Sequence, residues 1–123
     1  MIDIFKQRGV SHREGGPAWI KYHDNGSVFS KVYYMNGLIH REGGPAYVSF
    51  DKDGILQEEG YYIDGDPHRG EGPAFIRYNK GIIMREIYYI DGKIHRKGGP
   101  AFIEYFNGKV HHEEYYIDGV HSF

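Results

Sequence analysis

The sequence predicts an all-β protein, an elongated antiparallel β-meander of about four tandem hairpin repeats of 26–28 residues in a single twisted open sheet. Three observations predict this fold class. A motif that starts with His-Arg and ends with Gly-Pro-Ala recurs along the chain, segments rich in aromatic and β-branched residues follow it, and glycine-containing turns separate those segments. No stretch between glycines has the length and the 3.6-residue periodicity of a helix.

The spacing of the motif sets the domain organisation. The motif starts at His12, His40, His68 and His95, with spacings of 28, 28 and 27 residues, and one more histidine lies at position 121. We therefore expect a single β-repeat domain over residues 1–123. Its expected parts are a partial unit (1–9), four repeats (10–37, 38–65, 66–92 and 93–119) and a C-terminal stub (120–123).

Each repeat is expected to contain two strands. The first strand follows the Pro-Ala pair, and the second, longer strand ends in a Tyr-Tyr pair, such as Tyr33-Tyr34 in the first repeat. Both segments carry the aromatic and β-branched residues that favour strands, and Gly, Asn, Asp and Pro bound them. With the terminal segments, the sequence predicts eight or nine strands.

The turns between the paired strands explain the one-residue difference in repeat length. The first two repeats place three residues there, which suits a type I turn with a glycine bulge, whereas the last two place two residues, which suits a type I′ turn. The turns are expected at Asn25-Gly26, Asp53-Gly54, Lys80-Gly81 and Asn107-Gly108.

Strand alternation predicts which side chains share a face. We expect Ala18, Ile20 and Tyr22 to share an inner face with Val28, Val32 and Tyr34. The opposite face is expected to bind a partner, because aromatic side chains are enriched at protein interfaces. Its expected residues are an aromatic row (Trp19, Tyr47, Phe75, Phe102), a tyrosine row (Tyr33, Tyr61, Tyr88, Tyr115) and a charged row (Lys31, Glu59, Glu86, Glu113).

Composition and charge restrict the function. The formal net charge of −2 provides no overall positive field for nucleic acid or an anionic membrane, so neither is an expected partner. The absence of cysteine excludes disulfides, thiolate metal sites and cysteine nucleophiles. No segment approaches the ~18 apolar residues of a membrane span, and we expect a cytoplasmic protein.

The His-Arg pairs form the candidate site for an anionic ligand. They are His12-Arg13, His40-Arg41, His68-Arg69 and His95-Arg96. Equivalent positions in successive repeats lie about 9.6 Å apart, too far to share a zinc ion with bonds of ~2.0 Å, so no metal and no cofactor are expected. The first interpretation is that these pairs hold the loops between repeats. The alternative is that each arginine binds phosphate oxygens in a cleft where a tyrosine stacks on a base.

No motif in the sequence predicts catalysis. No serine lies in a nucleophile-elbow context, and no predicted helix follows the glycines as a dinucleotide site requires. The protein is therefore not expected to be an enzyme.

The repeats carry a family resemblance. Units of the form Tyr-Tyr-x-Asp-Gly, followed by a glycine turn and another aromatic strand, resemble the MORN-repeat superfamily, and more closely its bacterial and viral variants, some of which carry antitoxin-component names. The resemblance covers nearly the whole chain. It implies a β-repeat architecture and leaves a lipid-associated scaffold as one alternative function.

We predict a non-enzymatic binding module that acts by protein–protein interaction. Its function would be that of a stoichiometric inhibitor, either an antitoxin or a virus-encoded anti-defence protein such as an anti-CRISPR. The alternative is a protein that captures nucleotides or other phosphates in its Arg/Tyr clefts. Open sheet edges also predict a homodimer by edge-strand pairing, or the capture of a strand from the partner.

Overall fold

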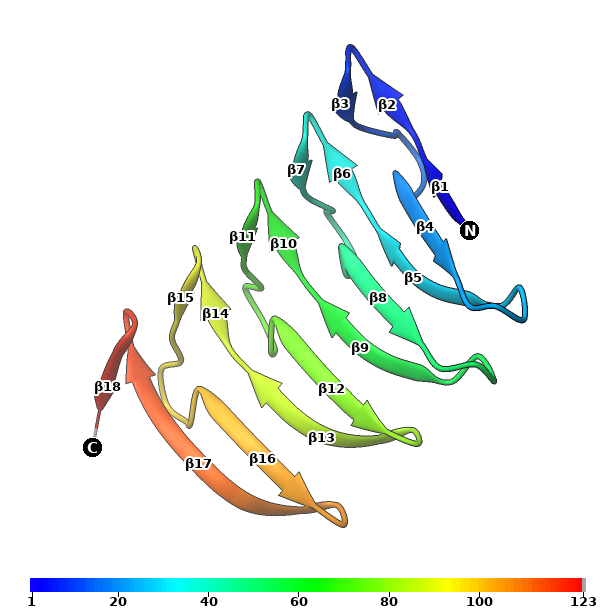
Figure 1. Cartoon of the computed structure of the whole chain (residues 1–123). Coiled ribbons are helices and arrows are strands. Elements are labelled where there is room, and N and C mark those ends of the chain that lie inside the picture. Colours follow the sequence, from blue (N-terminus) through cyan, green and yellow to red (C-terminus); the bar gives the residue numbers. More distant parts are fainter. Residues whose placement is uncertain (123) are drawn as a thin grey trace.

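The all-β fold is confirmed. The computed structural model describes residues 1–122, and they contain strands and turns but no helix. Ten strands form one large antiparallel sheet that does not close on itself, slightly more than expected (Figure 1). In order across the sheet they are β1 (Ile2–Ile4), β4 (Trp19–Tyr22), β5 (Val28–Val32), β8 (Tyr47–Phe50), β9 (Leu56–Gly60), β12 (Phe75–Asn79), β13 (Ile82–Ile87), β16 (Phe102–Phe106), β17 (Lys109–Ile117) and β18 (Val120–Ser122).

The four expected turns between paired strands are confirmed. Lys80 and Gly81 both have positive φ angles, 52° and 82°, as a type I′ turn requires. In the first repeat Gly26 has a φ of 88°, its N–H bonds the His23 carbonyl at 2.9 Å, and the His23 N–H bonds the Ser27 carbonyl at 2.8 Å. This is the expected three-residue loop with a glycine in the left-handed conformation.

A second, short hairpin follows β1 and the long strand of each of the first three repeats, and in the fourth repeat the end of β17 forms the equivalent hairpin with β18. We did not expect these hairpins. These hairpins stack in a row along one side of the sheet (Figure 1). The first four are β2 (Lys6–Gln7) with β3 (Val10–Ser11), β6 (Tyr34–Met35) with β7 (Leu38–Ile39), β10 (Tyr62–Ile63) with β11 (Asp66–Pro67), and β14 (Tyr89–Ile90) with β15 (Lys93–Ile94). The Gly37 N–H bonds the Ser11 carbonyl of the preceding hairpin at 2.9 Å, and Gly65 bonds Ile39 at 2.8 Å. Backbone hydrogen bonds therefore link successive repeats here as well as in the large sheet.

The expected assignment of side chains to faces holds for the first strand of a repeat and for Val28, but it is wrong for Val32 and Tyr34, because the main hairpin of each of the four repeats contains a β-bulge. Tyr22 pairs with Val28 as expected, but Ile20 pairs with Lys31. Phe29 is therefore an extra residue, and Gln57, Met84 and His111 occupy the same position in the other repeats. One extra residue shifts the pairing by one, which moves every following side chain to the other face.

The bulge divides the expected partner-binding residues between two faces. Trp19 pairs with Val32, and this side, here called the aromatic face, carries Trp19, Tyr47, Phe75 and Phe102. The charged row lies on the opposite side, here called the loop face, where Lys31 pairs with Ile20 and Val48. The tyrosine row follows the charged row two residues later along each strand and shares the loop face. Lys31, Glu59, Glu86, Glu113, Tyr33, Tyr61, Tyr88 and Tyr115 therefore do not share a surface with the aromatic row.

The core is thin. The buried apolar side chains are four alanines, which are all the alanines of the sequence, and two isoleucines; they are Ala18, Ala46, Ala74, Ala101, Ile76 and Ile103. No large side chain is fully buried among residues 1–122. The alanines precede the first strand of each repeat, and alternation places them on the loop face. None of these 122 residues belongs to a helix capable of spanning a membrane.

Candidate functional site

The histidine of each His-Arg pair fastens one repeat to the next. Nδ1 of His40 accepts a hydrogen bond from the backbone N–H of Asp64, at 3.0 Å. Asp64 is the first turn residue of the next short hairpin and has a φ of 48°. The equivalent bonds join His12 to Asn36, His68 to Asp91 and His95 to Asp118, at 3.1, 2.9 and 2.9 Å. Each histidine thus satisfies a backbone donor of a left-handed turn.

The arginine of each pair is held on three sides. The guanidinium carbon of Arg41 lies 4.0 Å from the centre of the Tyr33 ring, and Nη1 donates to the Pro45 carbonyl at 3.1 Å. A Cβ added at Gly44 would lie 3.0 Å from the guanidinium carbon, so glycine provides room for the stacked group. Arg13, Arg69 and Arg96 make the same contacts with Phe5, Tyr61 and Tyr88. These contacts hold the loops between repeats, and they place three members of the tyrosine row beneath loop arginines.

Successive loops enclose three clefts. Each cleft is lined by the arginines of two neighbouring repeats, the second histidine and the tyrosine beneath the second arginine. Cleft 1 contains Arg13, Tyr33, His40 and Arg41; cleft 2 contains Arg41, Tyr61, His68 and Arg69; cleft 3 contains Arg69, Tyr88, His95 and Arg96. Their volumes are about 340, 510 and 610 Å³. The structure therefore brings together most of the anionic-ligand candidates, while His12 lies outside these three clefts.

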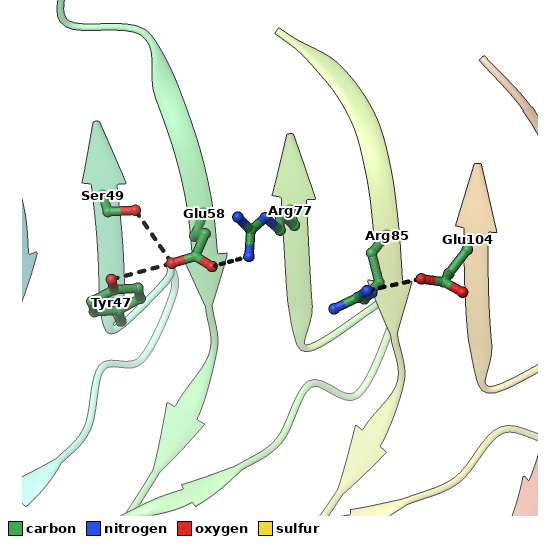
Figure 2. Close-up of polar contacts among 6 residues, drawn as sticks. All are labelled: Tyr47, Ser49, Glu58, Arg77, Arg85 and Glu104. Carbon is green, nitrogen blue, oxygen red and sulfur yellow. Dashed lines mark hydrogen bonds and ion pairs between the residues drawn. The ribbon is translucent and has the colours of Figure 1, made fainter. Parts of the chain in front are cut away.

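The aromatic face carries a polar row that we did not expect. Nη1 of Arg77 lies 3.6 Å from Oε2 of Glu58, and Nη2 of Arg85 donates to Oε2 of Glu104 at 2.8 Å (Figure 2). The Tyr47 hydroxyl and the Ser49 hydroxyl lie 3.3 and 3.5 Å from Oε1 of Glu58. The strands that carry these side chains, β8, β9, β12, β13 and β16, are neighbours in the sheet, and Figure 2 shows the side chains in a row across them. The row lies next to the aromatic row, two residues further along each strand.

A second aromatic row also lies on the aromatic face. The Tyr34 ring lies 5.8 Å from the Trp19 ring, and the Tyr62 ring covers Gly60, where an added Cβ would lie 2.8 Å from Cε1 of Tyr62. The second tyrosine of each Tyr-Tyr pair is the sequence signal for this row. The expected place of Tyr34 on the inner face is therefore wrong, and the bulge is again the reason.

Two large apolar side chains extend the aromatic face toward the turns. Ile82 and Phe106 have 58% and 68% of their surface exposed. They pair with Asn79 and Lys109, one residue beyond the pairs that lie on the loop face. They add exposed apolar surface beside the aromatic rows, and a contiguous apolar patch, unlike a single exposed apolar side chain, is typical of an interaction site.

On the loop face, tyrosines bond the charged row. The Tyr78 hydroxyl donates to Oε1 of Glu59 at 2.6 Å, and the Tyr105 hydroxyl donates to Oε1 of Glu86. Burial and these bonds raise the pKa of both hydroxyls, that of Tyr105 to about 12. Each of these tyrosines bonds the glutamate of the preceding repeat. Where Lys31 replaces that glutamate, Phe50 of the next repeat occupies the tyrosine position, and the Tyr22 hydroxyl of the first repeat donates to Oδ2 of Asp3 at 2.8 Å.

The raised pKa of the Tyr105 hydroxyl predicts how the stability of the fold changes at alkaline pH. The pKa of this hydroxyl in the folded state lies above the ordinary value of 10.0. The neutral hydroxyl therefore contributes its full stabilisation of the fold below pH 10, and this contribution is lost as the pH rises toward 12. We expect Tyr105→Phe to flatten the loss of stability over this range, measured by urea denaturation at several pH values. Equal loss in the wild type and the variant would show that this bond does not govern alkaline stability.

Comparisons of the chain with protein-family models, curated proteins and solved structures find no match. The resemblance to MORN repeats therefore stays a prediction from the sequence motifs. No group of three or more His, Asp or Glu side chains within residues 1–122 is arranged to hold a metal ion. The fold and its surfaces define an open β-repeat protein with a loop face of stacked arginines and an aromatic face that the described residues leave exposed.

Proposed function

We propose that the chain is a non-enzymatic protein-binding module whose aromatic face docks on a protein partner. The observation that carries the proposal is a like-charge pair in the middle of this face. Arg77 and Arg85 are direct cross-strand partners, with 50% and 37% of their side-chain surface exposed. Like charges at directly opposed positions destabilise a sheet. A local conflict of this kind is typical of a functional site.

The bonding of Arg85 supports a partner that supplies a carboxylate. Its guanidinium is partly exposed, and its one side-chain hydrogen bond within residues 1–122 joins Nη2 to Glu104, so further N–H donors remain for a partner. Glu58 and Glu104 lie on the outer sides of the arginine pair, and neither separates the two arginines. An acidic side chain from a partner, placed over Arg77 and Arg85, would relieve their repulsion through charge-assisted hydrogen bonds.

The neighbouring aromatic side chains suit the rest of such an interface. Phe75 and Phe102 flank the arginines on the same face and are partly exposed. Buried aromatic and arginine side chains contribute most of the binding energy in protein interfaces. The partner that fits this face is therefore a protein with an apolar patch around an acidic residue.

The exposed area of the molecule is consistent with this role. The described structure exposes 7821 Å², whereas a compact protein of the same mass exposes about 6,800 Å². The excess of about 1,000 Å² is comparable with the roughly 800 Å² that one partner contributes to a standard interface. We propose that the biological role is stoichiometric inhibition, by an antitoxin or a virus-encoded anti-defence protein such as an anti-CRISPR, which the MORN-like motifs also suggest.

Capture of the partner with matched variants tests the proposal. Wild type, Phe75→Glu and Glu113→Lys are used as bait, and the partner is the protein that the wild type retains in a 1:1 complex after purification. Phe75→Glu should weaken this complex by roughly 30-fold or more, as expected for a central aromatic residue. Glu113→Lys changes an exposed charge on the loop face and should bind like the wild type.

Further variants and a mass measurement complete this test. Arg77→Glu, at an exposed position, replaces Phe75→Glu if circular dichroism shows that the latter is unfolded. Binding that survives both aromatic-face substitutions but is lost in Glu113→Lys would refute the proposal. Light scattering of the wild type alone shows whether two copies pair through the sheet edges, which the sequence predicts.

A further inference from the structure

The three clefts share one architecture but differ in charge. The residue after each His-Arg pair is Glu14, Glu42, Gly70 or Lys97. Glu42 lines clefts 1 and 2, whereas Gly70 and Lys97 line cleft 3. With histidine neutral, two arginines and one glutamate give clefts 1 and 2 a formal charge of +1 each, and two arginines and one lysine give cleft 3 a charge of +3.

Cleft 3 is also the largest of the three. Its volume is about 610 Å³, compared with 340 and 510 Å³ for the other two. Gly70 stands where the preceding loops carry a glutamate, and the glutamate of this loop is Glu71, one residue later, which does not line cleft 3. Clefts lined by one sign of charge focus the electric field and concentrate ligands of the opposite sign.

The arginines of cleft 3 are already fixed in place. The guanidinium carbon of Arg96 lies 4.1 Å from the centre of the Tyr88 ring, and an added Cβ at Gly99 would lie 2.9 Å from it. Nη1 donates to the Pro100 carbonyl at 3.1 Å, the single hydrogen bond of this side chain within residues 1–122. A guanidinium has five N–H donors, so most of them are available to a ligand. A side chain that is immobile before binding loses less entropy when the ligand arrives.

We propose that cleft 3 binds the phosphate monoester group of a small molecule. Arg69, Arg96 and Lys97 contact the phosphate oxygens, while Tyr88 and Ile90 contact the remainder of the ligand. A phosphate monoester carries a charge of about −1.5 to −2 at neutral pH, which the charge of this cleft can compensate. The site is separate from the aromatic face and does not depend on the proposed protein partner.

Isothermal titration calorimetry with three probes tests this site. Adenosine monophosphate and inorganic phosphate should bind with one equivalent per chain, adenosine should not bind, and the affinity should fall with added salt. Lys97→Glu places in cleft 3 the residue that Glu14 and Glu42 provide in other loops, so the fold is expected to persist. This variant should bind the phosphate probes at least tenfold more weakly.

A gain-of-binding variant keeps the test decisive if Lys97→Glu folds poorly. Glu42→Lys raises the formal charge of clefts 1 and 2 to that of cleft 3, and it should bind more than one equivalent of adenosine monophosphate. Phe75→Glu should bind the probes like the wild type, whatever its effect on a protein partner. The proposal is overturned if the wild type shows no saturable binding at millimolar phosphate probe, if Lys97→Glu binds equally well, or if adenosine binds as tightly as its monophosphate.

Discussion

Replacing Arg69 with alanine is expected to lower the free energy of unfolding by about 2–3 kcal/mol, an order of magnitude set by the loss of a cation–π contact and a hydrogen bond. The guanidinium carbon lies 4.0 Å from the centre of the Tyr61 ring, Nη1 bonds the Pro73 carbonyl at 3.1 Å, and an added Cβ at Gly72 would lie 3.1 Å from that carbon. Truncation removes the stacking contact with Tyr61 and the hydrogen bond to Pro73. Because each repeat is supported mainly by its neighbours, the loss weakens the whole array.

Arg77→Ala is the matched control for this change. Arg77 is half exposed on the open sheet, and its ion pair with Glu58 spans 3.6 Å. An exposed ion pair of this kind contributes about 0–1 kcal/mol. Urea denaturation of both variants should therefore show a much larger fall for Arg69→Ala. Similar falls would mean that the stacked arginines do not hold the loops.

Ala74→Leu is expected to destabilise the fold by about 1–3 kcal/mol or more, because a packed position has no room for the added carbons. Ala74 is 1% exposed, and the equivalent Ala18, Ala46 and Ala101 are 0% exposed. The Ala74 N–H and carbonyl also bond Ile87 and Tyr61 of the neighbouring strands, at 2.9 and 2.7 Å, so the backbone cannot move away without breaking the ladder. Thermal unfolding followed by circular dichroism measures the effect.

Lys21→Leu is the control for the added side chain. Lys21 lies in the first strand of the first repeat, three residues after the equivalent Ala18, on the aromatic face, where it is exposed. A leucine there should change the stability by no more than about 0.5 kcal/mol, as is usual at surface positions. If Ala74→Leu were as stable as Lys21→Leu, the alanines would not be sites of close packing.

Much of the fold could be predicted from the sequence because short local motifs mark its turns and its repeat boundaries. Glycines that need positive φ identify both turn types, and the recurrent His-Arg motif fixes the repeat length. The short hairpins could also have been expected, since Asn36-Gly37 and Asp64-Gly65 are typical type I′ pairs that follow the Tyr-Tyr motif. Their strands are only two residues long, too short for an alternating pattern to reveal.

The distribution of side chains between the two faces could not be predicted, because a bulge leaves no strong mark in the sequence. Phe29, Gln57, Met84 and His111 occupy the bulge position, and they share no chemical property. One unrecognised residue per hairpin moved the charged row onto the loop face. The candidate site changed with it: the polar row of Glu58, Arg77, Arg85 and Glu104 lies beside the aromatic row, where Glu59 and Glu86 were expected.

The sequence shows that two loops lack the glutamate after the His-Arg pair, but it does not show that both changes affect the charge of one cleft. Gly70 and Lys97 stand out in an alignment of the four loops. Only the structure shows that these two residues line the same cleft, because the loops of neighbouring repeats form its opposite walls. Which of the repeated positions share a cleft depends on the stacking of the repeats.

Labelling of single cysteines tests most directly whether the aromatic face binds the partner. The natural sequence contains no cysteine, so one introduced thiol is the only site of reaction with a maleimide. Ile82→Cys and Val110→Cys suit this measurement, because the two side chains are similarly exposed, at 58% and 53%, and lie on opposite faces. Saturating amounts of the captured partner should slow the labelling of Ile82→Cys more than tenfold and leave that of Val110→Cys within twofold of its free rate. Protection of Val110→Cys with undiminished labelling of Ile82→Cys would contradict the account and place the partner on the loop face.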